Sequence, residues 1–582
     1  MKPEFSPQTR KQALERFTRE RFDVLVVGGG ITGAAVARDC VSRGLSVALL
    51  ERRDFSYGTS SRSSKLIHGG LRYLENFEFG LVFEALAERS LLLKTTPTMV
   101  RPLPFYFPVY EGDRTGRAVL GMGMWLYDLL ALFRSPGYHK SLSKERMLED
   151  LPGLRGEGLK GGFRYYDASM WDDVLGIEIL RDAARFGAAC ANYVEATKPV
   201  WTGDRITGFG FRDLETGAEG VLSADQVIIC AGPWTDQVGE TLAAGSREGK
   251  PWRNWLAPSK GVHLIFDLKR LPIPGAMVMS EPKDGRISFV IPRPDFGAGV
   301  VIVGTTDGAS PKDPDRAEIS RDDVEYLLGL LNRYFPSHRF TTQDILSAYI
   351  GVRPLAVPPT GGDGLSDSKS LQKVSREHTI DSGPGGTVVV AGGKYTTHRT
   401  MADEIVTFAL ARNRDLAARE RRRFSTKAAP NARTTPEALA EARAHSRAAE
   451  VQRELWERYG AEAIDVLRID DELRARGAAT FSANAAGATS SSSKVTDPEG
   501  FPRLEAQLRF NIRQGMVLHL EDFYLRRLPL FFARADHGLP WLDGLAMAWG
   551  EELGKSPAEV EAEKQSLRDE FARRENWRRS FS

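Results

Sequence analysis

Short apolar runs separated by glycines dominate the first fifty residues. Phe22–Val27 is a mostly apolar run of strand-forming residues, and Gly28–Gly30 follows it directly. Ile31–Arg43 has the pattern of a helix, Gly44 is a typical helix stop, and Ser46–Leu50 is a second apolar run. Two apolar runs joined by a helix are typical of parallel neighbours in one sheet, so this segment predicts a β-α-β unit.

Two more apolar runs end in glycine further along the chain. Gln226–Cys230 leads into Ala231-Gly232, and Thr387–Val390 leads through Ala391 into Gly392-Gly393. In a doubly wound sheet, ligands bind beyond the carboxyl ends of the strands. Residues 260–310 alternate instead between apolar and polar positions, which predicts antiparallel strands. We therefore expect an α/β fold, α+β overall, in which an antiparallel β-sheet substrate domain is inserted into a Rossmann-type cofactor domain.

Changes in composition and apolar pattern along the chain predict three parts. Residues 1–20 form an N-terminal extension, 21–410 form the ligand-binding region, and 411–582 form a helical C-terminal domain. Within the last part, Ala478–Lys494 is a low-complexity stretch and is expected to be a loop. The cofactor domain is expected at about 21–110, 165–240 and 345–410, and the substrate domain at about 111–164 and 241–344.

Charge and cysteine content exclude several classes of protein. The 582 residues include 79 Lys and Arg against 77 Asp and Glu, a net charge of +2, whereas proteins that coat nucleic acid are usually far more basic. The three cysteines, Cys40, Cys190 and Cys230, lie far apart in the sequence. They predict neither a disulfide framework nor a metal site, and they fit a reducing compartment such as the cytoplasm.

The chain shows neither a secretory signal nor a membrane span. Met1–Arg21 lacks an apolar core, and no apolar run reaches the roughly 18 residues that a span needs. Gly121–Phe133 comes nearest, but it is short and contains Asp128, so we expect a buried helix in preference to a segment lying on a membrane.

The first glycine cluster has the spacing of a dinucleotide site. Gly28, Gly30 and Gly33 form G-x-G-x-x-G between the first predicted strand and helix, and Glu51 ends the second strand. The glycines allow a tight turn, a close approach of pyrophosphate and close helix packing, while the carboxylate can accept hydrogen bonds from a ribose. This pattern predicts an adenine dinucleotide, and by itself it leaves FAD and NAD open.

A second segment is rich in small hydroxyl residues. Gly58–Leu74 reads GTSSRSSKLIHGGLRYL. Hydroxyl and backbone N–H groups at this density can wrap a pyrophosphate and a ribityl chain. The embedded His68, Arg72 and Tyr73, with apolar neighbours, argue against an ordinary surface loop.

These blocks together resemble the signatures of the FAD-dependent glycerol-3-phosphate dehydrogenases. The resemblance runs from VVGGGITGAAVARD and GTSSRSSKLIHGGLRYLE through AGPW at 231, KGVH at 260, GTTD at 304, GVRPL at 351 and GGKYTT at 392. It implies a flavoprotein fold of the D-amino-acid-oxidase type and FAD as the cofactor. The positions that it implies for cofactor binding are Gly28, Gly30, Thr32, Gly33, Glu51, Thr59, Ser60, Ser61, Ser64, Lys65, Leu66, His68, Ala231, Gly232, Gly393, Lys394, Thr396 and Thr397.

The resemblance also implies a substrate, sn-glycerol 3-phosphate, and its product, dihydroxyacetone phosphate. A phosphate dianion suits permanently charged, planar donors such as arginine. The matching substrate positions are Arg72, Tyr73, Thr305, Thr306, Arg353, Arg376 and Lys394. Arg376 stands in a polar stretch, where a surface arginine is an almost equal alternative.

Oxidation of the alcohol needs removal of its O–H proton and transfer of the C2 hydride to flavin N5. His68 is the first candidate for the base and His263 the second, because histidine titrates near neutral pH. Arg353 and Lys394 would stabilise negative charge in the transition state. The family generally passes electrons to a quinone, which implies peripheral contact with the cytoplasmic face of a membrane. Candidates for that contact are Lys250–Lys260 and Gly121–Phe133, and a homodimer is left open.

Several other functions remain open on the sequence. An oxidase of the same substrate would pass electrons to dioxygen and form hydrogen peroxide. An amine or amino-acid oxidase could use the same fold, although several Arg and Lys positions favour a phosphate. A catalytically inactive, flavin-binding regulatory protein would keep the cofactor alone. The Arg-rich region 410–450 is interspersed with acidic residues, which favours a solvated helix face over an RNA site.

Overall fold

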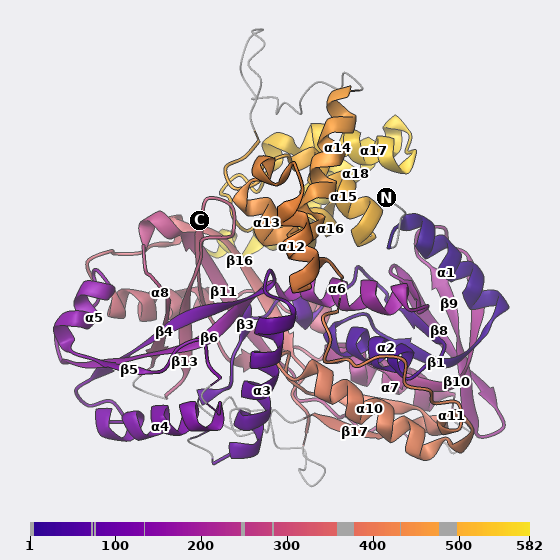
Figure 1. Cartoon of the computed structure of the whole chain (residues 1–582). Coiled ribbons are helices and arrows are strands. Elements are labelled where there is room, and N and C mark those ends of the chain that lie inside the picture. The colour runs from indigo at the N-terminus through magenta and orange to yellow at the C-terminus, as the bar shows by residue number, and fades with distance from the viewer. Residues whose placement is uncertain are drawn as a thin grey trace.

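A computed structural model describes residues 5–71, 74, 77–132, 134–245, 251–281, 285–357, 378–430, 432–475 and 497–581. Arg72, Tyr73, Arg376 and the low-complexity stretch 478–494 lie outside the described residues. Two sheets stand side by side, and a helical C-terminal domain lies over the junction between them (Figure 1).

The first sheet contains the predicted β-α-β unit. Its strand order is β17-β18-β10-β1-β2-β7, and the five strands from β18 to β7 are parallel. The antiparallel strands β8 and β9 extend it from β10, and β17 closes the opposite edge. The strands are β1 (Arg21–Val27), β2 (Val47–Leu50), β7 (Ala189–Ala191), β8 (Val194–Thr202), β9 (Arg205–Asp213), β10 (Glu219–Ile229), β17 (Thr379–Ser382) and β18 (Val388–Ala391).

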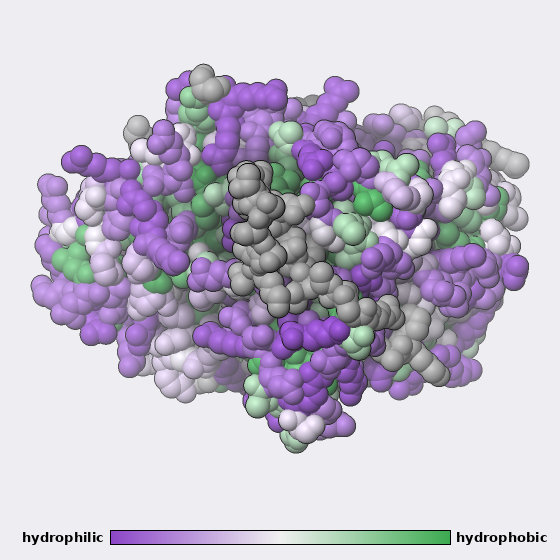
Figure 2. Space-filling model, turned by 90° about the horizontal axis from the view of Figure 1, so that it is seen from above, coloured by the Kyte–Doolittle hydropathy of each residue, from purple (hydrophilic) through white to green (hydrophobic). Residues whose placement is uncertain are grey.

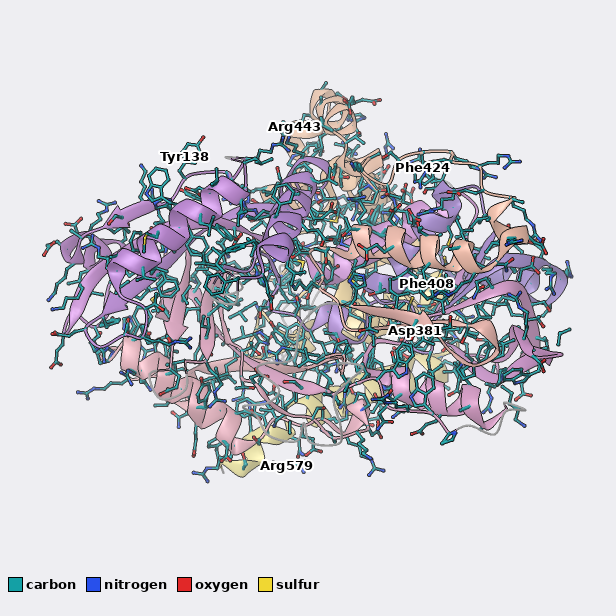
Figure 3. All side chains as sticks on the ribbon, turned by 90° about the horizontal axis from the view of Figure 1, so that it is seen from below. Tyr138, Asp381, Phe408, Phe424, Arg443 and Arg579 are labelled. Carbon is teal, nitrogen blue, oxygen red and sulfur yellow. The ribbon has the colours of Figure 1, made fainter. Side chains whose placement is uncertain are left out.

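Helices cover both faces of this sheet, as expected for parallel strands buried on both sides. One apolar core joins α2 (Ile31–Ser42), α6 (Asp172–Arg185) and α10 (His398–Arg412) to the strands. On the other face, α1 (Pro7–Arg19) packs through Ala13 and Phe17 in a second core with β8, β9 and β10. The predicted N-terminal extension therefore contains a helix that is part of this layer. Figure 3 shows α10 from below, with Phe408 and Phe424 labelled.

The second sheet is antiparallel except where β4 runs parallel to β12. Its order is β15-β11-β14-β13-β12-β4-β6-β3, with β16 beside β11 and β5 beside β6. The strands are β3 (Leu66–Ile67), β4 (Val100–Tyr110), β5 (Lys140–Leu142), β6 (Leu159–Met170), β11 (Ser259–Asp267), β12 (Ala276–Ser280), β13 (Ile287–Arg293), β14 (Val300–Gly304), β15 (Gly308–Ala309) and β16 (Ile345–Arg353).

The strands divide differently from the expected domain boundaries. We expected 100–110, 165–170 and 345–353 in the cofactor domain, but β4, β6 and β16 all hydrogen-bond within the second sheet. The backbone pairing decides this, and the apolar pattern of a strand does not reveal its partner. The second sheet is covered by α8 (Arg321–Tyr334), while α3 (Phe79–Thr95), α4 (Arg117–Leu130) and α5 (Lys144–Asp150) lie in the connections.

The C-terminal part is helical, as predicted. Its elements are α11 (Arg414–Ala417), α12 (Pro436–Ala444), α13 (Arg453–Tyr459), α14 (Ala463–Ala475), α15 (Leu504–Gly515), α16 (Leu520–Asp522), a π-helix η11 (Phe523–Arg527), α17 (Leu542–Leu553) and α18 (Pro557–Arg574). Seen from above, the face around this domain is mainly hydrophilic (Figure 2). Among the described residues, none of the helices has the length and apolar character required to cross a bilayer.

One expectation about burial was wrong. Residues 121–130 lie in α4, which we predicted to be buried, but α4 buries a single face. Leu120, Met124 and Tyr127 point into the core, whereas Met122 and Trp125 are each 65% exposed. An apolar run gives no sign of which helical face meets water when both faces carry apolar side chains.

Candidate functional site

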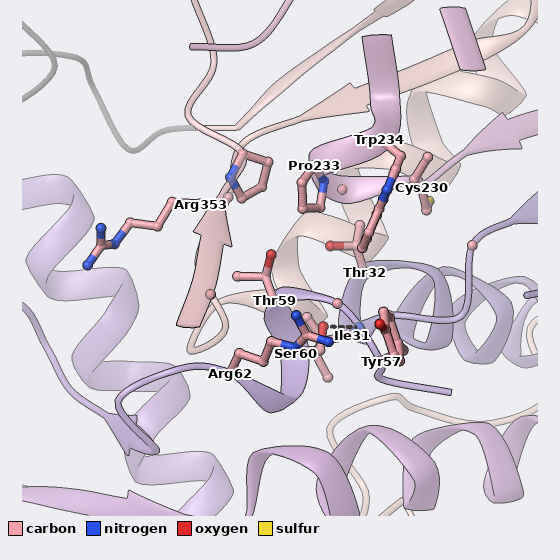
Figure 4. Close-up of a pocket in the computed structure, with 18 of the residues that line it drawn as sticks. Ile31, Thr32, Tyr57, Thr59, Ser60, Arg62, Cys230, Pro233, Trp234 and Arg353 are labelled. Carbon is pink, nitrogen blue, oxygen red and sulfur yellow. Dashed lines mark hydrogen bonds between the residues drawn. The ribbon is translucent and has the colours of Figure 1, made fainter. Parts of the chain in front are cut away.

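A cavity of about 480 Å³ opens where strands of the two sheets end. The segments that follow β1, β10 and β18 meet there, as the glycine-ended runs predicted, and the end of β16 closes one side. Figure 4 shows part of the lining. The predicted residues that line it are Gly28, Gly30, Thr32, Glu51, Thr59, Ser60, Ser64, Leu66, His68, Ala231, Gly232, His263, Thr305, Arg353, Gly393, Lys394 and Thr396.

The glycine-rich turn leaves room that only glycine provides. Gly28 has φ +110°, and a Cβ there would stand 2.4 Å from the carbonyl oxygen of Cys230. A Cβ on Gly33 would stand 1.9 Å from the carbonyl oxygen of Gly28, so this glycine lets α2 pack on the turn. Gly30 is the N-cap of α2 and provides no side-chain cap. The positive end of the helix therefore faces the cavity, where an anionic group is favoured.

Glu51 supports this turn from the end of β2. One carboxylate oxygen accepts a hydrogen bond from Gly29 N at 2.7 Å, and the other accepts one from Arg53 N at 2.8 Å. Burial raises the pKa of Glu51, while these two hydrogen bonds act in the opposite direction. Glu51 lines the cavity, and its contact with a ribose hydroxyl stays a prediction from the sequence.

The hydroxyl-rich loop joins the turn to the second sheet. Ser60 Oγ accepts a hydrogen bond from Ile31 N at 2.9 Å, and Thr59 Oγ1 donates to the carbonyl oxygen of Val352 at 2.5 Å. Gly351 has no side chain, and a Cβ there would lie 2.6 Å from the carbonyl oxygen of Arg62. This glycine lets the loop lie directly against β16.

Arg353 stands at the end of β16, where the cavity reaches the second sheet. Its guanidinium donates to Thr305 Oγ1 at 2.9 Å and to the carbonyl oxygen of Thr306 at 3.2 Å. Asp307 lies 3.4 Å away, and the side chain remains 21% exposed. Arg353 Nη1 also donates to Ser259 Oγ and to the carbonyl oxygen of Lys260, and its contact with Asp307 is an ion pair. A planar cation that is partly exposed in the cavity wall suits an anionic ligand in addition to this pair. Lys394 lines the same cavity from the segment after β18.

The two candidate bases occupy different surroundings. His263 is buried, its Nε2 lies 2.9 Å from Ser64 Oγ, and its ring stacks on Tyr349 at 4.6 Å. Burial, with Arg353 and Lys65 nearby, lowers the pKa of His263 well below its usual value, so the ring is neutral near pH 7. His68 follows β3, is half-buried, and lines the cavity.

Five of the predicted residues that the structure describes do not line the cavity. Gly33 lies behind the turn, and Thr306 Oγ1 accepts a hydrogen bond from Val262 N. Lys65 forms a buried ion pair with Asp172 at 2.5 Å. The other two are Ser61, whose hydroxyl donates to the carbonyl oxygen of Tyr57, and Thr397, buried at the start of α10. Their positions support the walls of the site.

The sequence did not single out several residues of the lining. Trp234, next to Gly58, and Arg62, whose guanidinium lies 4.6 Å from the centre of the Tyr57 ring, face the cavity (Figure 4). Trp234 stands in the motif AGPW and Arg62 in the motif GTSSRSS, so their position within these motifs was the sequence signal that could have identified them. Val194–Ala196 also line the cavity but carry no chemical pattern that distinguishes them.

These features fit an adenine dinucleotide that carries a flavin. The glycine turn and helix end suit the pyrophosphate, and Glu51 suits a ribose. The same cavity is also lined by the hydroxyl-rich loop and by the charged side chains of Arg353 and Lys394. Among the described residues, no group of three or more acidic, histidine or cysteine side chains could hold a metal ion.

Comparison with known proteins agrees with this geometry. Residues 23–399 match the family described as "FAD dependent oxidoreductase", and residues 410–560 match "C-terminal domain of alpha-glycerophosphate oxidase". The chain is 35% identical over 563 residues to a glycerol-3-phosphate dehydrogenase of Mycobacterium leprae, covering 96% of this chain and 89% of that protein. The chain belongs to the FAD-dependent glycerol-3-phosphate dehydrogenase family.

Other members of this family show the same extent of similarity. An aerobic glycerol-3-phosphate dehydrogenase of Staphylococcus aureus is 30% identical, with 95% of each chain covered. The crystal structure of a glycerol-3-phosphate dehydrogenase from Bacillus halodurans, complexed with FAD, matches with a TM-score of 0.74 at 27% identity, covering 97% of this chain and 98% of that one. The predicted fold, family and cofactor are thereby confirmed, and the chain is an FAD-dependent oxidoreductase.

Proposed function

We propose that this enzyme oxidises sn-glycerol 3-phosphate to dihydroxyacetone phosphate. The observation that carries the proposal is the pair of cationic side chains, Arg353 and Lys394, in the wall of the cofactor cavity. Guanidinium and ammonium groups together match a phosphate dianion, whereas an amino-acid carboxylate needs one such group. The names of the full-length relatives support the same substrate.

The chain itself must bind the phosphate, orient the alcohol and take its proton. FAD, when bound, supplies the acceptor for the hydride that leaves C2. Hydrogen bonds to Thr305 Oγ1 and to the carbonyl oxygen of Thr306 fix the guanidinium of Arg353, so its orientation is set before the substrate arrives. His263 is neutral near pH 7 and lines the cavity, so its imidazole can accept a proton. His68 is the other candidate for this step.

We propose a membrane quinone as the electron acceptor and the exposed face of α4 as the contact with the bilayer. Val119, Met122, Trp125 and Leu129 form this face, Leu132 follows just after the helix ends, and each of the five is between 49% and 65% exposed. Phe77, Phe79 and Phe83 add exposed aromatic rings at the start of the neighbouring helix α3. Helix α4 and the start of α3 lie on the side of the molecule away from the C-terminal domain (Figure 1), whereas the last residue of α3, Thr95, accepts a hydrogen bond from Thr434 of that domain.

Charges around the α4 face suit an anionic bilayer. Arg114, Arg117 and Arg134 are exposed at the two ends of the helix. Tyr138 is also exposed, and Figure 3 shows it pointing outward. An apolar, aromatic helix face bordered by arginines is typical of proteins that lie in the interface of a membrane. In the other candidate segment, Trp252 and Trp255 stack on each other, and Trp252 donates to Asp236.

Anaerobic mixing of the purified holoenzyme with glycerol 3-phosphate tests the reaction. We expect the visible absorbance of the flavin to bleach with sn-glycerol 3-phosphate and to persist with glycerol, which lacks the phosphate. Bleaching by glycine or sarcosine, and not by glycerol 3-phosphate, would contradict the substrate. The match of residues 410–560 to a glycerophosphate-oxidase domain keeps dioxygen as a second acceptor. Stoichiometric hydrogen peroxide in aerated buffer would favour dioxygen over a quinone.

A further inference from the structure

A buried ion cluster joins the C-terminal domain to the loop that follows β2. Arg527 donates two hydrogen bonds to the carboxylate of Asp54, at 2.8 and 2.9 Å, and Arg526 Nε donates a third at 2.5 Å. The arginine side chains are 2% exposed and that of Asp54 is 0% exposed. Asn192 of the cofactor domain adds a hydrogen bond from its side-chain amide at 3.2 Å.

The same loop supports the glycine-rich turn on its other side. Ser56 N donates to the carbonyl oxygen of Gly29 at 3.0 Å, and Arg53 N donates to Glu51, which also holds Gly29 N. Phe55 packs so closely that a Cβ on Gly29 would stand 2.7 Å from its ring. The loop therefore contacts the dinucleotide turn at one edge and the two arginines at the other.

An unusual backbone presents the arginines. Phe523–Arg527 forms a π-helix, a rare element that is often found at functional sites. Arg526 also donates to Asp522 at 2.8 Å, and Arg527 donates to the carbonyl oxygen of Gly515 at 2.7 Å. These contacts fix both guanidinium groups before they reach Asp54.

The cluster is a costly way to join two domains. Burying several charges is offset only when their geometry and hydrogen bonds are good, and apolar residues of similar volume often stabilise a fold as well or better. Removal of one partner, in contrast, leaves an uncompensated buried charge. Arg527 and Arg526 hold the pKa of Asp54 below its usual range, against the effect of burial, so the carboxylate is ionised near neutral pH.

We propose that Arg526 and Arg527 are positioning residues of the cofactor site, through which docking of the C-terminal domain and binding of FAD stabilise each other. The proposal rests on FAD binding and not on the proposed substrate or electron acceptor. Because coupling between two sites is reciprocal, an ordered loop 51–57 favours both the cofactor and the C-terminal domain. The C-terminal domain thereby acts on the cofactor turn through Asp54.

Hydrogen exchange on the full-length wild-type chain tests the coupling without any substitution. We expect added FAD to slow exchange both in residues 51–57 and in residues 515–527 of the C-terminal domain. FAD protection that is confined to the cofactor domain would overturn the proposal. The reduction of flavin by substrate is not part of this readout, so a failure of the proposed function would leave it unaffected.

Substitutions then separate positioning from general stability. Arg527→Met should weaken FAD binding by about tenfold or more, measured by flavin fluorescence during titration of the deflavinated chain, and Arg527→Lys should retain part of the affinity. Arg509→Met is the matched control, because Arg509 is also buried but pairs with Glu505, Glu551 and Glu552 inside the C-terminal domain.

The control also defines the outcomes that contradict us. Equal losses of FAD affinity in Arg527→Met and Arg509→Met would show a general effect of stability and overturn the proposal. Unchanged affinity in Arg527→Met would do the same. If Arg527→Met does not fold, Asp54→Asn keeps the shape of the side chain and removes its charge, and it should weaken FAD binding in the same way.

Discussion

The imidazole of His263 lies 2.9 Å from the hydroxyl of Ser64 and thereby joins the second sheet to the cofactor loop. Tyr349 stacks on the other side of the ring and donates from its hydroxyl to the carbonyl oxygen of Ser63. The ring is therefore held in one orientation by neighbours on both the loop and β16. A candidate base that is fixed in this way is already oriented when the substrate arrives.

Replacement of His263 should slow flavin reduction. General base catalysis is typically worth 10²- to 10⁴-fold, so His263→Asn should lower the anaerobic reduction rate by about 10²-fold or more. The neutral ring is the active form and its pKa is lowered, so activity should persist below pH 6.5 and fall only at more acidic pH. Stopped-flow measurements of both histidine variants decide between the candidates. A native rate in His263→Asn together with a slow His68→Asn would assign the proton to His68.

Replacement of Arg353 should weaken substrate binding and leave the cofactor in place. A hydrogen bond to a charged group contributes about 1.5–3 kcal/mol, so Arg353→Met should raise KM for glycerol 3-phosphate by about 10- to 100-fold. Arg316→Met is a suitable control, because that side chain is 82% exposed. Steady-state kinetics with the measured flavin content give the comparison. An unchanged KM in Arg353→Met would place the phosphate elsewhere.

A methyl group at position 33 should prevent tight binding of FAD. Because a Cβ there would stand 1.9 Å from the carbonyl oxygen of Gly28, Gly33→Ala must push α2 away from the turn, at a cost of about 1–3 kcal/mol. We expect a protein without yellow colour and with a lower Tm. Gly329→Ala in α8 has open space around its Cβ and should retain the flavin. Purification of a Gly33→Ala protein with a full complement of bound FAD would refute this account of the turn.

A charge on the α4 face should release the protein from membranes. Trp125→Glu should reduce cosedimentation with vesicles of phosphatidylcholine and phosphatidylglycerol, because the exposed indole would otherwise enter the interface. Val221→Glu changes another exposed apolar residue, 54% exposed on β10, and should bind vesicles normally. Anaerobic flavin reduction should be unchanged in both. Equal vesicle binding by Trp125→Glu and the wild type would exclude this face.

His519, which lies between the C-terminal and cofactor domains, should make the folded protein less stable as the pH becomes alkaline. Burial would lower the pKa of His519, but hydrogen bonds to Glu215 and Glu563 outweigh it and raise the pKa to about 11. A raised folded-state pKa means that this stabilisation is complete below about pH 6.5, the unfolded value, and is lost as the pH rises toward 11. Tm of the wild type should therefore fall across this range more than Tm of His519→Gln. Parallel pH profiles would contradict the assignment.

The sequence predicted the parts of the site that depend on local backbone geometry. The turn at Gly28–Gly33, the acceptor Glu51 and the segments after β10 and β18 are each encoded by a strand, a glycine and their spacing. Contacts between distant segments were not predictable in this way. Lys65 stands among hydroxyl residues that were predicted to bind the cofactor, yet its ammonium pairs with Asp172 of α6. Nothing near Lys65 in the chain indicates that partner.

The exposed side of α4 and the arginines of η11 show a second limit. An apolar run such as residues 121–130 predicts a helix but leaves open whether its second apolar face is covered. Arg526 and Arg527 look like ordinary surface charges in the sequence, where most arginines are solvated. Their burial against Asp54 follows from the docking of the C-terminal domain, because the two arginines stand 472 and 473 residues after Asp54 in the chain.

Gly351 lies between the hydroxyl-rich loop and Arg353 and influences the position of both. Its bare Cα admits the backbone of Arg62 on one side, and the strand that it belongs to delivers Arg353 two residues later. A larger residue would push the hydroxyl-rich loop away from β16 and would also displace the guanidinium of Arg353. We therefore expect a substitution of Gly351 to weaken the binding of the coenzyme and of the phosphate ester together. Evolution could not adjust one affinity at this position without changing the other.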